Sequence, residues 1–150
     1  MIPTKKLGDA DVELVQIMDN QHLLYKNLAL STLDDPVFTY FQKRDFRLAF
    51  NNHRLTILAL IDKKIAGYYH IDTENQTNWF GIFIAQPFRG QGLGKLLIQH
   101  AQEFSKIEGI TLDLMVYTYN ATAINLYKKM NFHTTHCDGE KIFMQWNRPN

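Results

Sequence analysis

The chain has 150 residues, of which 45% are hydrophobic, which is enough for one compact core and too little for two. Its formal net charge of +1 gives no electrostatic case for binding nucleic acid or a membrane surface. No apolar run reaches the ~18 residues of a membrane-spanning helix, and the N-terminus lacks a signal-peptide pattern. The single cysteine, Cys137, excludes an internal disulfide and favours a reducing, cytoplasmic setting. We therefore expect one domain over residues 1–150, acting as a monomer or a homodimer.

The N-terminal third is predicted to hold one short strand and two helical regions. Lys5–Leu7 is the predicted strand, and Asp9 is placed to cap the segment Asp11–Leu30, which is predicted to be one broken helix or two helices. The run Asp34-Asp35-Pro36 is typical of a second helix start, which would continue to about residue 50. Aromatic residues are dense in this second region and either pack in the core or line a pocket. They are Phe38, Tyr40, Phe41, Phe46 and Phe50.

Three strands joined by short turns are predicted next. Leu55–Ile61 and Ile65–Asp72 flank a polar turn at residues 62–64, a pattern that indicates a hairpin. Trp79–Ile84 is aromatic and β-branched, which favours a buried strand. Pro87 should end that strand, because proline has no amide hydrogen to donate to a sheet ladder. Strands connected so closely form an antiparallel meander.

A glycine-rich loop and a long helix follow the third of these strands. Apolar residues at offsets of three and four predict the helix, and Gly109 is placed to end it. The residues of this face are Leu93, Leu96, Leu97, His100, Ala101, Phe104 and Ile107. Glycines leave room beside the main chain, and a helix start presents N–H groups without intrahelical partners, so the loop suits a phosphate group. Arg89 would add a positive charge there; the alternative is a helix start that only turns sharply.

The C-terminal part is predicted to hold a strand, a helix and a hairpin. Ile110–Tyr117 would pair in parallel with Trp79–Ile84, with Leu112, Leu114 and Val116 on one face and Asp113, Met115 and Tyr117 on the other. Asn120 can cap a helix that runs to about residue 130, and Asn131 tolerates the left-handed conformation at its end. Residues 132–136 and 141–146 would then form a hairpin around 138–139. The predicted fold class is therefore α/β of the α+β type, with a mixed, mostly antiparallel sheet, a central parallel strand pair and flanking helices.

The glycine loop does not match the two common nucleotide-binding loops. A Walker loop needs Ser or Thr after Gly-Lys, where this chain has Leu96, and a Rossmann loop has the spacing Gly-x-Gly-x-x-Gly. The run from Arg89 to Gly94, with Gly92 between them, instead resembles the acetyl-coenzyme A signature of the GNAT-type N-acetyltransferase superfamily. That family binds the pyrophosphate of the coenzyme with this loop and the helix start.

A second stretch, Asn120–Phe132, resembles the same family. Asn120 is followed three residues later by Ala123, then by Leu-Tyr at 126–127, and the stretch closes with Asn131 where the family usually has glycine. The resemblance covers about residues 55–146. It implies a single-domain GNAT-like fold and acetyl-coenzyme A as co-substrate, with no metal.

The resemblance also implies roles for individual residues. The loop residues Arg89, Gly90, Gln91, Gly92, Leu93 and Gly94 would bind the coenzyme. The backbone of Ile82, Phe83 and Ile84 would bind the pantetheine and the thioester carbonyl, where the flanking strands splay apart. Asn120 would contact the coenzyme, and Tyr127 would protonate the departing thiolate, because a phenol of pKa ~10 holds its proton at neutral pH. The structural alternative is that Tyr127 is a core aromatic beside Ala123 and Met130.

The general base is left open by the sequence. Relatives that acetylate protein N-termini often carry a glutamate where this chain has Met115. Asp113, Asp72, Glu74 and His70 could act instead, although each is also explained as a solvated turn or edge residue. We expect an N-acetyltransferase acting on a primary amine of a small molecule by direct attack in a ternary complex. The alternatives are a peptide or protein N-acetyltransferase and a non-catalytic coenzyme A-binding module.

Overall fold

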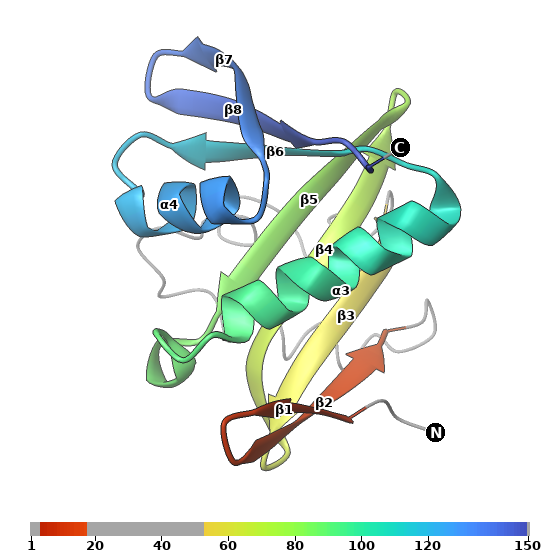
Figure 1. Cartoon of the computed structure of the whole chain (residues 1–150), viewed down its shortest axis with the longest axis vertical. Coiled ribbons are helices and arrows are strands. Elements are labelled where there is room, and N and C mark those ends of the chain that lie inside the picture. The colour runs from red at the N-terminus through yellow and green to blue at the C-terminus, as the bar shows by residue number, and fades with distance from the viewer. Residues whose placement is uncertain (1–3, 18–52, 150) are drawn as a thin grey trace.

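In the computed structural model of the chain, residues 4–17 and 53–149 are described, and they form an eight-stranded sheet with two α-helices (Figure 1). The strands are β1 (Thr4–Leu7), β2 (Ala10–Gln16), β3 (His53–Ile61), β4 (Lys64–Glu74), β5 (Thr77–Ile84), β6 (Leu112–Tyr117), β7 (His133–Asp138) and β8 (Lys141–Trp146). The helices are the short 3-10 helix η1 (Gln86–Phe88), α3 (Leu93–Glu108) and α4 (Ala121–Lys129). The strand order is β1-β2-β3-β4-β5-β6-β8-β7, with only β5 and β6 parallel among these strands. The predicted mixed, mostly antiparallel sheet is confirmed.

The N-terminal segment is a β-hairpin, so the prediction of a helix from Asp11 is wrong for residues 11–17. Thr4–Leu7 pairs with Ala10–Gln16, and Asp9 lies in the turn between them rather than at a helix cap. Polar and apolar residues alternate along β2, with Val12 and Leu14 buried, and this period of two fits a strand better than a helix. The rest of the two predicted helical regions, including the aromatic set of residues 38–50, lies outside the described residues.

The predicted meander is present from β3 to β5. Each hairpin turn has two residues with positive φ, Asp62 and Lys63 in the first and Asn75 and Gln76 in the second. Two such residues in succession make a type I′ turn, whose twist matches that of the flanking strands. The pairing continues over the full length of β4, which places β4 and β5 at the centre of the sheet.

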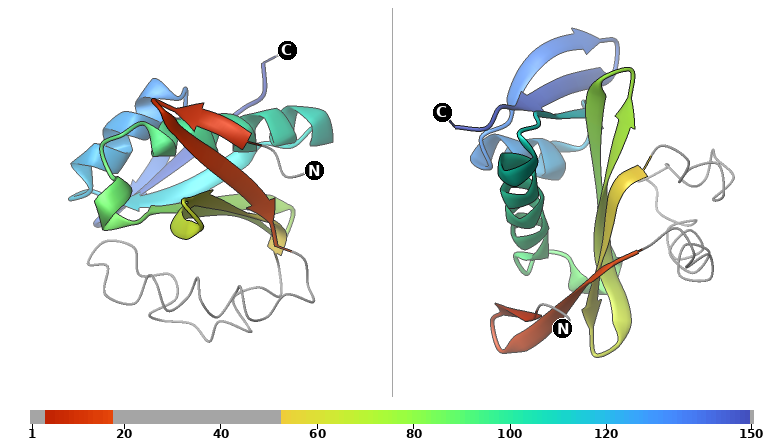
Figure 2. Two further views of the ribbon diagram at one scale, coloured as in Figure 1. Left: turned by 90° about the horizontal axis from the view of Figure 1, so that it is seen from below. Right: turned by 90° about the vertical axis from the view of Figure 1, so that its right-hand side faces the viewer.

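Helices α3 and α4 cover one face of the sheet (Figure 2). The buried side of α3 was predicted only in part, because Ile107 is 84% exposed whereas Ile98 is buried. At 100° per residue, Ile107 lies about a third of a turn from the centre of the buried stripe. That stripe comprises Leu93, Leu97, Ile98, Ala101 and Ser105. The predicted end of the helix is confirmed, since Gly109 caps it in the left-handed conformation.

A hydrogen bond joins α3 to the sheet in the middle of this core. The Tyr69 hydroxyl and His100 Nδ1 lie 2.6 Å apart. Burial raises the pKa of Tyr69, so its phenol keeps the proton, while burial and the nearby charge of Lys5 lower the pKa of His100. Tyr69 is therefore the donor and neutral His100 the acceptor.

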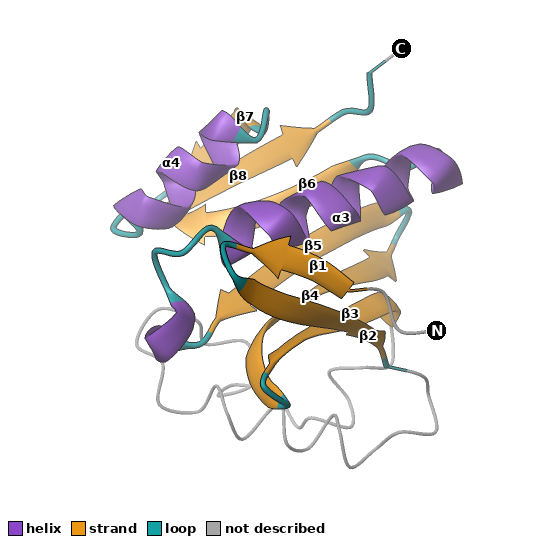
Figure 3. Ribbon diagram, turned by 60° about the horizontal axis from the view of Figure 1, so that its bottom comes forward, coloured by secondary structure: helices purple, strands orange, loops and turns teal. Residues whose placement is uncertain are grey.

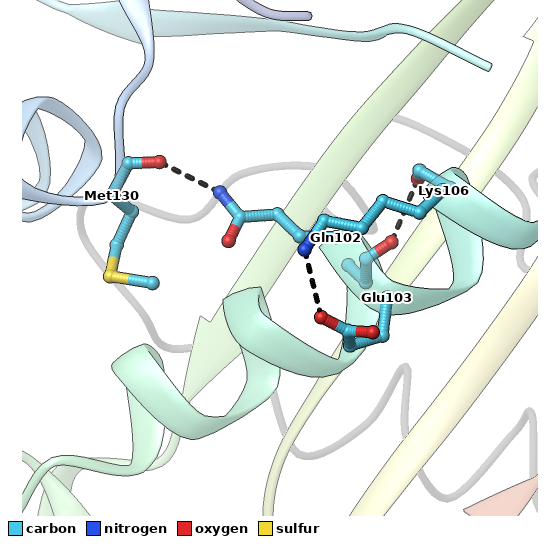
Figure 4. Close-up of polar contacts among 6 residues, drawn as sticks. Gln102, Glu103, Lys106 and Met130 are labelled. Atoms are coloured by element: carbon cyan, nitrogen blue, oxygen red, sulfur yellow. Dashed lines mark hydrogen bonds and ion pairs between the residues drawn. The ribbon is translucent and has the colours of Figure 1, made fainter. Parts of the chain in front are cut away.

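The C-terminal unit follows its prediction closely. Leu112, Leu114 and Val116 are buried, and Asn120 Oδ1 accepts a hydrogen bond from the Ala123 amide at 3.3 Å. Asn131 adopts φ 69° after the last turn of α4, as predicted. Gln102 of α3 donates its side-chain amide to the carbonyl of Met130 at 2.7 Å and so joins the two helices (Figure 4). No helix among the described residues is long and apolar enough to cross a membrane.

Candidate functional site

The centre of the described sheet is open between its two parallel strands. Over the described residues the ladder between β5 and β6 consists of one pair, Trp79 and Asp113, near the amino-terminal ends of both strands. Beyond that pair the strands diverge, and α4 and the first turn of α3 lie beside the opening (Figure 1). Ile82, Phe83 and Ile84 pair with β4 on their other edge. The Ile84 carbonyl accepts a hydrogen bond from Arg89 Nε, and binding of the coenzyme by the backbone of residues 82–84 stays a prediction of the resemblance.

The glycine loop leads from the end of β5 into α3. Gly90 and Gly92 have φ of 75° and 91°, a region in which L side chains are strained, and Gly92 is the residue that precedes the helix. Among the described residues no side chain caps this helix start, and no acidic residue lies in its first turn. The N–H groups of Leu93, Gly94 and Lys95 therefore have neither an intrahelical acceptor nor a side-chain cap, which leaves them to an anion.

Arg89 has a structural role in this loop that the sequence did not indicate. Its Nε donates to the carbonyl of Ile84 at 2.8 Å, and its guanidinium lies 5.9 Å from the centre of the Phe83 ring. Gln91 makes a similar bond, from Nε2 to the Pro87 carbonyl at 3.2 Å. The first bond holds the loop against the end of β5, and the second joins the loop to η1.

Helix α4 lies directly against the start of α3 (Figure 3). A Cβ atom at Gly94 would come within 2.9 Å of Leu126 Cδ2, the end of a flexible side chain, so the two helices pack closely at this point. Asn120, predicted to contact the coenzyme, uses its Oδ1 to cap α4. This contact lies where α4, the helix that carries Tyr127, meets the end of the glycine loop.

Tyr127 is buried on the inner side of α4. Its ring is 5.7 Å from that of Phe132, which in turn is 6.1 Å from Phe80 of β5. Burial raises the pKa of the Tyr127 phenol, which therefore carries its proton at neutral pH. No hydrogen bond joins the Tyr127 hydroxyl to another described residue. A protonated phenol close to the open end of the sheet could serve as a proton donor, and its packing against Phe132 gives it a structural role as well.

Of the candidate bases, those on β6 and at the end of β4 lie outside the core. Met115 is 37% exposed on the outer face of β6, and Asp113 on the same face accepts a hydrogen bond from Gln145 at 3.1 Å. Glu74 is exposed at the last residue of β4. None of these observations identifies the base.

His70 and Asp72 differ from the turn or edge residues that the sequence suggested. His70 is buried in the middle of the sheet, and the carboxylate of Asp72 lies 2.8 Å from Nε2 of His53, a residue that sequence analysis missed. The alternation His70-x-Asp72 was the one available signal for a polar face on β4. The sequence could not place His53 with these two residues, because the face of the sheet to which its side chain points depends on an irregularity in β3.

The comparisons with known proteins agree on one family. The model of the acetyltransferase (GNAT) family matches residues 20–132. The peptidyl-lysine N-acetyltransferase YjaB of Salmonella typhimurium is 41% identical over 54 residues, which are 36% of this chain and 34% of that protein. The match thus spans about a third of the length of this relative.

Solved structures show the same fold. YncA of Salmonella typhimurium, solved with its cofactor acetyl-CoA, superimposes with a TM-score of 0.70 at 12% identity, over 95% of this chain and 96% of that one. Nourseothricin acetyltransferase has a TM-score of 0.56 at 27% identity, over 66% of this chain and 67% of that one.

Proposed function

Because the chain belongs to the GNAT family of acetyltransferases, we propose that it moves an acetyl group from acetyl-coenzyme A to a primary amine of a small molecule. The observation that carries this proposal is the opening between β5 and β6, which lies beside the uncapped start of α3 and the helix that bears Tyr127. Family membership supports acetyl-coenzyme A as the acyl donor. The small-molecule acceptor and the residue roles below are the proposal.

The coenzyme would lie along the loop and into the opening. The N–H groups at the start of α3 would bind its pyrophosphate, where the helix dipole and Lys95 both favour negative charge. The pantetheine arm would then reach the open edge of β5, whose backbone at residues 82–84 would bind the arm and polarise the thioester carbonyl. The acetyl carbon would thus be held in place for attack by the acceptor.

The reaction would be a direct displacement in a ternary complex. The neutral amine attacks the thioester carbonyl carbon, the carbon–nitrogen bond forms, and the carbon–sulfur bond breaks as the thiolate leaves. Tyr127 would give its phenol proton to that sulfur, and the surplus proton of the attacking nitrogen would pass to water or to a base that stays unassigned. The phenol would then recover its proton from solvent.

The acceptor class rests on weaker support than the acyl donor. Met115 stands where relatives that act on protein N-termini often have a glutamate, and similarity to nourseothricin acetyltransferase favours a small molecule. The segment similar to a peptidyl-lysine N-acetyltransferase favours a peptide as the second candidate. Thiol release from acetyl-coenzyme A should be measured with amino sugars, polyamines, aminoglycosides and a lysine-containing peptide. Turnover with the peptide and with none of the small amines would favour a peptide N-acetyltransferase. Coenzyme binding without turnover on any amine would indicate a binding module.

Cys137→Ala is expected to keep near-normal turnover. Cys137 is exposed on the edge strand β7, away from the opening between β5 and β6, and direct transfer needs no cysteine nucleophile. Turnover of the variant should be compared with wild type, and the wild-type protein should be analysed by mass spectrometry after mixing with acetyl-coenzyme A alone. An acetyl group trapped on Cys137 and a large loss of turnover in the variant would together contradict direct transfer.

A further inference from the structure

Four polar residues form a compact group on the sheet face opposite α3. In the β3–β4 ladder, His53 is the cross-strand partner of Asp72, and Thr56 is the partner of His70. Neighbouring residues Tyr69 and Ile71 belong to the core beneath α3, so His70 and Asp72 must point to the other face. The group therefore lies apart from the loop, from α4 and from Tyr127.

A β-bulge explains how His53 joins this group. Between His53 and Leu55 the register shifts by one residue, because β3 has one residue more than β4 at this point. In a regular strand, residues three apart point to opposite faces; the extra residue brings His53 to the face of Thr56. Bulges commonly redirect a side chain near a functional site.

The ligand atoms of the group converge. His53 Nε2 lies 2.8 Å from Asp72 Oδ1, the rings of His53 and His70 have centroids 4.7 Å apart, and one donor atom from each of the three residues lies within 4.8 Å of the other two. The side chains of His53 and Asp72 are 5% and 13% exposed, and His70 is 3% exposed. Two imidazoles and a carboxylate thus meet where water is largely excluded.

Two neighbouring residues fix the orientation of the histidines. His53 Nδ1 is hydrogen-bonded to Thr56 Oγ1, and the ring of His70 lies over Gly81 of β5, where a Cβ atom would collide with Nε2. When Nδ1 donates to the hydroxyl, Nε2 faces the carboxylate of Asp72 at 2.8 Å, and this contact is favourable with either a second ring proton or a bound metal cation between the two atoms. This is the usual outer arrangement of a metal-binding histidine, whose second nitrogen donates to an oxygen.

We propose that His53, His70 and Asp72 bind a divalent transition-metal ion, with zinc as the ion that best fits two imidazoles and a carboxylate. Zinc bonds of 2.0–2.1 Å in tetrahedral geometry place the ligand atoms about 3.3 Å apart. The atoms His53 Nε2 and Asp72 Oδ1, now 2.8 Å apart, must therefore separate slightly, and the ligand nitrogen of His70 must move closer to them. Three protein ligands leave a fourth position for water or another donor. The site is additional to acetyl transfer and supplies no step of it.

The first test is zinc titration of the metal-free full-length chain by calorimetry. Wild type is expected to bind one zinc ion with a dissociation constant below about 10 µM, a binding free energy of about 7 kcal/mol. His53→Gln and Asp72→Asn each remove one ligand and should lower the affinity by at least 100-fold. Thr56→Val removes only the outer hydrogen-bond partner and should lower it by about 10–100-fold. His133→Gln, an exposed histidine on β7, is the matched control and should bind like wild type.

The second test locates the ion without any variant. Wild-type crystals grown with zinc should show an anomalous peak at the zinc edge among His53, His70 and Asp72, and cobalt in place of zinc should give the intense visible bands of a four-coordinate site. A dissociation constant for zinc above about 100 µM would overturn the proposal. An anomalous peak beside the exposed residues His133, His136 and Cys137 would also overturn it. So would loss of zinc binding in His133→Gln while the ligand variants still bind zinc.

Discussion

Tyr127→Phe is expected to lower turnover by about 10²–10⁴-fold, the range that general acid help supplies, while the affinity for acetyl-coenzyme A changes little. The substitution keeps the ring that packs against Phe132 and removes only the hydroxyl. Because no described residue is hydrogen-bonded to that hydroxyl, its removal should leave the melting temperature nearly unchanged. The loss should therefore appear in the rate of thiol release and not in binding or stability.

The pH dependence gives this prediction a second readout. Burial raises the pKa of Tyr127 above its ordinary value of about 10, so the phenol stays protonated up to at least that pH. The variant should consequently show a rate profile of the same shape as wild type between about pH 6 and 10, lowered by a constant factor.

Tyr69→Phe is the matched control for Tyr127→Phe. It removes another buried phenol, whose hydrogen bond to His100 should contribute about 1 kcal/mol to the free energy of unfolding. Its melting temperature should fall while turnover stays near that of wild type. If Tyr127→Phe behaved like this control, or turned over like wild type, water would replace Tyr127 as the proton donor.

Gly92→Glu is expected to abolish binding of acetyl-coenzyme A. Gly92 has φ 91° and lies immediately before the first turn of α3, so a glutamate there would place a negative charge where the pyrophosphate is proposed to bind. Wild type should be stabilised by about 2.7 kcal/mol at a coenzyme concentration of 100 times its dissociation constant, and the variant should show no stabilisation. Thermal melting with and without coenzyme measures both.

Gly92→Ala separates the charge from the strained backbone. Any L side chain at this left-handed position is strained, and the added Cβ would meet only Leu7 Cδ1 at 3.5 Å. Both variants should therefore melt below wild type, but the alanine variant should still respond to the coenzyme. An equal response from Gly92→Glu would place the pyrophosphate elsewhere, and a wild type that does not respond would contradict the coenzyme assignment.

The sequence predicted most of the described fold from β3 onward, because periodicity and turn residues agree there. Trp79–Ile84, the glycines and the Asn120 cap each have one local interpretation, and the structure has them all in place. The segment after Asp9 was mispredicted because residues that fit an amphipathic helix also alternate as a strand over 10–16. Long-range pairing with β3 decides between the two, and no local pattern contains that information.

The candidate site was predictable where it is local and unpredictable where it depends on register. The loop from Arg89 to Gly94 is continuous in sequence, so its position before α3 was clear, although the bond from Arg89 to Ile84 was not. The pairing of His53 with Asp72 follows from the bulge in β3, and a shift of one residue turns a side chain to the other face. The roles assigned to the site residues stay predictions until the variants are measured.

The single residue pair that joins β5 to β6 leads to a conflict between stability and activity. Further pairs between these strands would add hydrogen bonds at the centre of the sheet and make the free protein more stable. They would also close the opening in which the coenzyme is proposed to lie. A screen for thermostable variants should therefore favour substitutions that draw β5 and β6 together, and such variants would lose acetyl transfer as they gain stability. On the proposed function, the incomplete centre of the sheet is a stability deficit retained for acetyl transfer.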